Sequence, residues 1–66
     1  MSKFTLKAAR VNVGLSQIEA AQALNVSNKT LWKWEKGLSL PNAQKIVELC
    51  ELYKCKYDDI IFLPVN

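Results

Sequence analysis

The sequence predicts an all-α fold built from five short helices. Apolar residues recur at helical spacing along most of the 66 residues, and only two glycines and two prolines interrupt them. Residues whose side chains cap helix starts stand just before several of the apolar stretches. Nothing in the sequence reads as a strand pair. We therefore expect one domain over residues 1–66, made of helices alone.

The first helix is expected over about residues 5–13. Four residues at positions i, i+3, i+4 and i+7 form one face of it, namely Leu6, Ala9, Arg10 and Val13. Gly14 then ends the helix. The second helix begins at Ser16, which has capping-box spacing with Glu19 and precedes an alanine-rich stretch.

The third helix is expected over about residues 28–36, between the N-cap Ser27 and Gly37. Asn25 can supply a left-handed turn before it, so residues 16–37 form a helix-turn-helix unit. At 100° per residue the third helix has two unlike faces. Leu31 and Trp34 lie on the inner side, and the outer side carries Asn28, Lys29, Trp32, Lys33 and Lys36.

The last two helices are expected over about residues 42–53 and 57–62. The inner face of the fourth is expected to carry Ala43, Ile46, Val47, Cys50 and Tyr53, with Leu49 widening it. Asp58 and Asp59 stand in the first turn of the fifth, where negative charge suits the helix dipole.

The charge is unevenly distributed along the chain. Residues 1–45 carry seven basic and two acidic side chains, whereas residues 46–66 carry two basic and four acidic ones. This asymmetry suggests that the first two-thirds contacts a polyanion. A face of solvated lysines is the alternative interpretation of the third helix. The exposed starts of the second and third helices, at Gln17 and Asn28, also suit phosphate.

Several functions are excluded by composition. There is no histidine, and Cys50 and Cys55 are too few ligands for structural zinc, so we interpret both as small apolar fillers. The longest apolar run, Ile60 to Leu63, is four residues, too short for a membrane span or a signal peptide. We expect a cytoplasmic protein associated with the nucleoid, with no enzymatic activity, metal, cofactor or small-molecule ligand.

Separated features together resemble the phage-repressor/Cro-like helix-turn-helix family, also called the xenobiotic-response-element class. The similar stretch covers about residues 5–62. Its most specific features are Leu15-Ser16-Gln17, Val26-Ser27, Trp34-Glu35-x-Gly37 and Pro41, together with Leu6, Arg10 and Ala21. The resemblance implies a five-helix, lambda-repressor-like domain that binds double-stranded DNA, regulates transcription and acts as a dimer. The short chain resembles small stand-alone regulators of phages or mobile elements in prokaryotes.

The resemblance also assigns roles to individual residues. It places Asn28, Lys29 and Lys33 at base-reading positions, and Gln17 at a position that contacts phosphate and sometimes bases. It implies a structural ion pair between Arg10 and Glu35. Contacts with the DNA backbone are expected from Ser16, Ser27, Thr30, Trp32, Lys36, Ser39 and Asn42. The family usually has a large aliphatic residue where this chain has Ala20, so Ile18 or a neighbour is expected to fill the space.

Three questions stay open in the sequence. Trp32 can pack on the DNA side or fold back near Leu38. The apolar C-terminal residues Tyr57, Ile61, Phe62 and Leu63 can form a homodimer surface for a pseudo-palindromic operator, or simply cover the first helix. A protein-interaction or antitoxin-type module is the alternative function, although such a module need not keep several lysines and Gln17 together.

Overall fold

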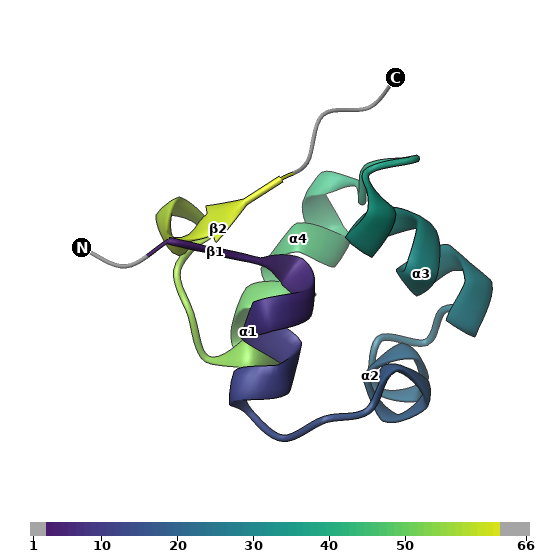
Figure 1. Cartoon of the computed structure of the whole chain (residues 1–66). Coiled ribbons are helices and arrows are strands. Elements are labelled where there is room, and N and C mark those ends of the chain that lie inside the picture. Colours follow the sequence, from purple (N-terminus) through teal and green to yellow (C-terminus); the bar gives the residue numbers. More distant parts are fainter. Residues whose placement is uncertain (1–2, 63–66) are drawn as a thin grey trace.

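The computed structural model describes residues 3–62, in which four α-helices surround a small core (Figure 1). No helix in this part of the chain is long and apolar enough to cross a bilayer. α1 lies centrally and contacts α3, α4 and both short strands, while α2 packs against α3. The elements in chain order are β1 (Phe4–Thr5), α1 (Leu6–Asn12), α2 (Gln17–Ala23), α3 (Asn28–Lys36), α4 (Ala43–Tyr53), the 3-10 turn η1 (Tyr57–Asp59) and β2 (Ile60–Ile61).

All four α-helices begin at a residue whose side chain accepts a hydrogen bond from a backbone N–H three residues ahead. These N-caps are Thr5, Ser16, Ser27 and Asn42. At α2 the capping box is complete, because the Ser16 backbone N–H also donates to Glu19 Oε1 over 2.9 Å. The predicted starts of the two helices of the helix-turn-helix unit are therefore confirmed.

Two left-handed residues shape the helix-turn-helix unit, one in its turn and one at its end. Asn25 adopts φ 57° between α2 and α3, as predicted from its tolerance of this conformation. Gly37 adopts φ 75° directly after α3, where its N–H group reaches the carbonyl groups of the last turn. A side chain at this φ is strained, so glycine suits the position. α3 is thus held to nine residues.

The core is built mainly from residues at helical spacing, and small side chains let α2 lie close to α3. Ala20 and Ala21 of α2 are both buried. Of the two alternatives for filling the space beside Ala20, Ile18 is ruled out because it is 60% exposed, which leaves a neighbouring residue. The core residues are Leu6, Ala9, Ala20, Ala21, Leu24, Leu31, Trp34, Leu49, Tyr53 and Ile60.

α4 is rotated relative to the inner face that was predicted for it. Leu49 and Tyr53 are its buried residues, whereas Ala43 and Val47 are exposed. The buried residues Leu49 and Tyr53 lie about 40° apart at 100° per residue, and Val47 lies about 140° from the direction midway between them. The prediction for α4 was based on the positions of its apolar residues, and it therefore turned the expected inner face too far toward Val47.

The two cysteines meet where α4 ends. Lys54 is left-handed at φ 55°, and the Cys55 N–H donates to the Cys50 carbonyl oxygen over 3.1 Å. This is the wide hydrogen bond of a Schellman motif, which typically brings the side chains of these two positions into contact. Both thiols are free and half-buried, and burial raises the pKa of each above its ordinary value. They fit the expected role of apolar fillers.

The predicted fifth helix is replaced by a turn and a strand. η1 is a single 3-10 turn, and β2 follows it and pairs in parallel with β1, Phe4 opposite Ile60 and Thr5 opposite Ile61. The expectation that the chain lacks a strand pair was therefore wrong. A helix of six residues is marginal, and β-branched Ile60 and Ile61 favour an extended backbone. Burial of Ile60 in the core fixes the pairing.

Candidate nucleic-acid interface

α3 exposes one face and buries the other. Asn28, Lys29, Trp32, Lys33 and Lys36 are all exposed, while Leu31 is fully buried. The two tryptophans separate as predicted, Trp32 being 40% exposed and Trp34 only 8%. The lysine-rich face is thus carried by a helix that is anchored in the core along its other side.

The start of α3 leaves backbone donors facing outward. Ser27 Oγ accepts from the Thr30 N–H over 3.0 Å, and the two hydroxyl oxygens are 2.8 Å apart. The N–H groups of the first turn have no acceptor within a helix, and the Ser27 side chain covers only one of them. The remaining donors lie beside Asn28 and Lys29, where the helix dipole favours an anion.

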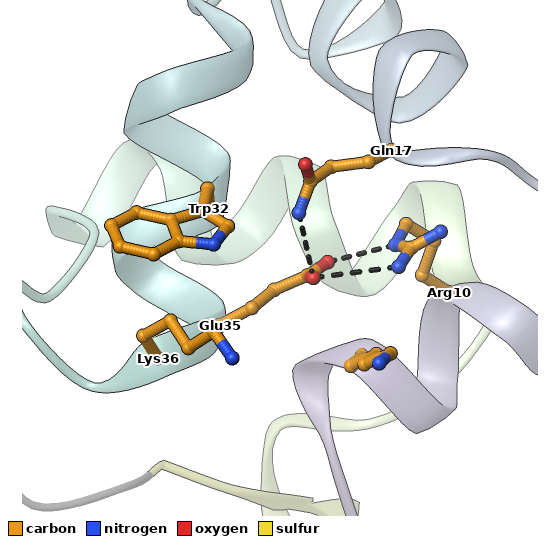
Figure 2. A pocket seen from close by; sticks show the side chains of 6 residues that line it. Arg10, Gln17, Trp32, Glu35 and Lys36 are labelled. Carbon is orange, nitrogen blue, oxygen red and sulfur yellow. Dashed lines mark hydrogen bonds and ion pairs between the residues drawn. The ribbon is translucent and has the colours of Figure 1, made fainter.

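A buried ion pair fixes α3 to α1. Arg10 Nε lies 2.8 Å from Glu35 Oε2, and the side chains are only 10% and 5% exposed (Figure 2). Arg10 also donates through Nη1 to the Leu15 carbonyl oxygen over 2.9 Å. The pair expected from the resemblance is therefore present. A buried pair contributes little net stability, but it fixes orientation because neither partner can leave the other unpaired.

Gln17 joins the same cluster from α2. Its Nε2 donates to Glu35 Oε1 over 3.0 Å, so the carboxylate of α3 accepts hydrogen bonds from both α1 and α2 (Figure 2). Within residues 3–62 this amide makes no other hydrogen bond. Gln17, expected to contact DNA, is thus first a positioning residue, and it keeps one amide hydrogen and its carbonyl oxygen available.

A cavity of about 240 Å³ adjoins this cluster. The nitrogen edge of the Trp32 indole faces the space between Gln17 and Glu35 (Figure 2). Lys36 lies on the side of Glu35 opposite to Gln17. Lys7 of α1 also lines the cavity, and sequence reasoning had not selected it. The available signal was its spacing, because Lys7 precedes Arg10 by three residues and so shares its side of α1.

The other residues expected at a DNA backbone serve as caps or lie in connections. The Ser16 and Ser27 hydroxyl groups cap α2 and α3, and Asn42 Oδ1 accepts from the Lys45 N–H over 2.9 Å. Ser39 is half-buried in the α3–α4 connection. The capping oxygens of Ser16, Ser27 and Asn42 therefore already accept hydrogen bonds, whereas the Ser16 hydroxyl hydrogen, the Asn42 amide NH2 group and nearby backbone N–H groups remain able to donate.

The C-terminal apolar residues divide into a buried and an exposed group. Ile60 is buried, and β2 contacts α1, so this residue covers the first helix. Tyr57 and Ile61 are 57% and 44% exposed, and the Tyr57 and Phe62 ring centres lie 5.7 Å apart. These two rings line an apolar cavity of about 150 Å³ with Leu40, Pro41 and Ile46. Leu63, named with them, lies outside the described residues.

Comparison with known proteins gives a family match over nearly all of the residues that the structure describes. The family model described as Helix-turn-helix matches residues 6–60. The HTH-type transcriptional regulator ImmR of Bacillus subtilis (strain 168) is 34% identical over 56 residues, which are 85% of this chain and 44% of that protein. The chain thus spans less than half the length of this relative. No solved structure gives a significant match.

Proposed function

Since the chain belongs to the phage-repressor/Cro-like helix-turn-helix family, we propose that it is a sequence-specific DNA-binding transcriptional regulator. The observation that carries the proposal is the division of α3. One face is anchored by Leu31, Trp34 and the Arg10–Glu35 pair, and the other presents an amide and three ammonium groups. A helix with such a face fits the major groove of B-form DNA.

In this proposal, sequence is read by residues 28–33, the first six of the nine residues of α3. Asn28, Lys29 and Lys33 are exposed there. An amide pairs well with the donor and acceptor of adenine, and lysine pairs with the two acceptors of guanine. Gln17 contributes the amide hydrogen that Glu35 does not use. These four residues specify the site.

The proposed contacts with the DNA backbone surround this reading face. Phosphate contacts set the register of the protein on the duplex without carrying sequence information. Lys36 stands one turn beyond the base-reading residues and supplies charge. The other proposed backbone contacts are Ser16, Ser27, Thr30, Trp32, Ser39 and Asn42.

We propose that the protein acts as a homodimer on a pseudo-palindromic operator. One recognition helix reads only a few base pairs, too few to single out a site among the competing sites of a genome. A two-fold dimer places a second helix about one helical turn away. The exposed side chains of Tyr57 and Ile61, with the half-buried Phe62, supply an apolar surface for it.

The proposal is tested by selecting bound duplexes from random DNA and footprinting the enriched sequence. We expect two inverted half-sites about 10 base pairs apart, with two protein chains per duplex. A single asymmetric half-site bound by one chain would contradict the dimer.

The matched control is the Lys29→Ala/Lys33→Ala double variant, which keeps the core and should enrich nothing. If the unaltered protein enriched nothing, the protein-interaction alternative would be favoured. Placing the enriched site in a reporter promoter tests regulation.

A further inference from the structure

The cavity between α1, α2 and α3 is lined by several donors, of which only Gln17 takes part in the proposed reading of bases. Its wall is formed by Lys7 and Arg10 of α1, Gln17 of α2, and Trp32, Glu35 and Lys36 of α3. At about 240 Å³ it exceeds by far what a single water molecule requires. A phosphodiester group therefore has room in it.

The charges on the cavity wall favour an anion. Lys7, Arg10 and Lys36 are positive, and Glu35 is the only negative group that the described residues 3–62 place on the wall. The Glu35 carboxylate is already satisfied, because it accepts from Arg10 and Gln17 at 2.8 and 3.0 Å. The wall therefore keeps an excess of positive charge, carried by the two exposed lysines.

We propose that this cavity binds one phosphate group of the DNA backbone, with Lys7 and Lys36 supplying charge and the Trp32 indole N–H donating a hydrogen bond. The inference rests on the proposed function and adds α1, through Lys7, to the DNA-binding surface. It also assigns Trp32 to the phosphate side of α3. The indole nitrogen edge facing into the cavity carries this assignment (Figure 2).

A backbone phosphate suits the position better than a free anion. Trp32 and Lys36 belong both to the cavity wall and to the exposed face of α3. DNA bound to that face therefore brings a strand to the cavity opening. Phosphate contacts beside a recognition helix fix its depth and angle in the groove, which makes Lys7 a positioning residue for base reading.

The first experiment compares Lys7→Ala with the charge-matched control Lys56→Ala, whose exposed lysine is not on the cavity wall. Binding to the selected duplex and to a scrambled duplex is measured over a salt series. Lys7→Ala is expected to weaken both about equally, by roughly 3- to 10-fold, and to lower the salt slope by about one unit. Equal slopes for the two variants would overturn the proposal. Alanine is a strong helix former, so α1 is retained.

A second experiment locates the phosphate. Duplexes are prepared in which one phosphate at a time is replaced by an uncharged methylphosphonate. For the unaltered protein, several positions in each half-site should weaken binding, one for each contacted phosphate. Lys7→Ala should lose this sensitivity at one of these positions and keep it at the others. If Lys7→Ala and the unaltered protein responded alike at every position, no phosphate would contact Lys7.

The source of the phosphate is decided by the Trp32 indole N–H resonance. It is expected to shift with the selected duplex and to stay in place with inorganic phosphate at the same phosphate concentration. An equal shift with inorganic phosphate would assign the cavity to a free anion and overturn the proposal. If these experiments show that the cavity binds no phosphate, the proposed function still stands as long as Lys33→Ala changes the sequence preference. Absence of any selected duplex would overturn the proposed function itself.

Discussion

Arg10 and Glu35 lie 25 positions apart in the sequence, yet their side chains meet at 2.8 Å in the buried space between α1 and α3. Glu35 is on the helix that presents the lysines, one residue before Lys36. The pair therefore controls the rotation of α3 about its own axis. Any change in the pair should reach the proposed DNA-binding face through that rotation.

Replacing Arg10 by methionine is expected to destabilise the fold before it alters sequence preference. Glu35 would remain buried with Gln17 as its one hydrogen-bonding neighbour. Breaking a buried pair from one side leaves an uncompensated charge, so we expect a loss of about 2 to 4 kcal/mol. Thermal unfolding followed by circular dichroism measures it. A melting curve identical to that of the unaltered protein would show that the pair does not form in solution.

The matched control removes both charges. An Arg10→Met/Glu35→Leu variant leaves no unpaired charge behind, and such replacements are often close to neutral for stability. We expect it to recover most of the lost stability, while binding of the selected duplex stays weaker because α3 loses its polar anchor. Full recovery of both stability and binding would contradict the orienting role of the pair.

Gln17→Ala tests the double role of this amide. Its hydrogen bond to the Glu35 carboxylate is partly buried, so its loss should cost about 1 to 2 kcal/mol of stability. Because Gln17 is also proposed to read bases, binding should fall more on the selected duplex than on a scrambled one. An equal loss on both duplexes would show that Gln17 only positions α3.

The helix starts could be predicted because their signals are local. Ser16 with Glu19, and Ser27 with the following turn, contain everything that a cap requires within four residues. The two faces of α3 were also predictable, since its burial pattern repeats with the helical period. The turn at Asn25 follows from the same local rules.

The features that sequence reasoning missed depend on distant parts of the chain. Phe4 pairs with Ile60 only because the core brings the two ends together, and two-residue strands leave no repeating pattern. The hydrogen bond between Gln17 and Glu35 and the position of Lys7 on the cavity wall also depend on contacts between distant parts of the chain. The ion pair was expected only through family resemblance.

The two tryptophans should respond differently to truncation. Trp34 is buried in the core, so Trp34→Ala should cost about 3 to 5 kcal/mol, enough to unfold a domain of this size. Trp32 is 40% exposed, and Trp32→Ala should leave a folded protein that binds DNA more weakly. Unfolding midpoints and near-ultraviolet circular dichroism compare them. Equal destabilisation would assign Trp32 to the core.

Tyr53→Phe is expected to leave stability unchanged or to raise it by up to about 1 kcal/mol. The Tyr53 hydroxyl group is buried and has no hydrogen-bond partner among the described residues. Burial and the nearby Glu35 charge both raise the pKa of this phenol, so it stays neutral at ordinary pH. Removing an unsatisfied polar group relieves its desolvation cost. Chemical denaturation measures the change, and a loss above about 1 kcal/mol would reveal a partner for the hydroxyl.

The lysines of α3 should divide into residues that read bases and residues that contact phosphate. Lys29 is the second residue of the helix, Lys33 is the sixth and Lys36 is the last. Lys29→Ala or Lys33→Ala should cost about 1 to 3 kcal/mol on the selected duplex and much less on a scrambled one. Lys36→Ala should weaken both duplexes alike and lower the salt slope by about one unit.

Binding of the three single variants to both duplexes over a salt series separates these roles. All three lysines are exposed, so none of the substitutions opens a cavity in the core, and alanine preserves the helix. The comparison therefore isolates the contact with DNA, because each variant loses the same charge from the same helix. Only the position of the lost ammonium group differs. If all three variants behaved identically, the face would supply charge without reading sequence, and specificity would have to come from Asn28, Gln17 or the shape of the DNA.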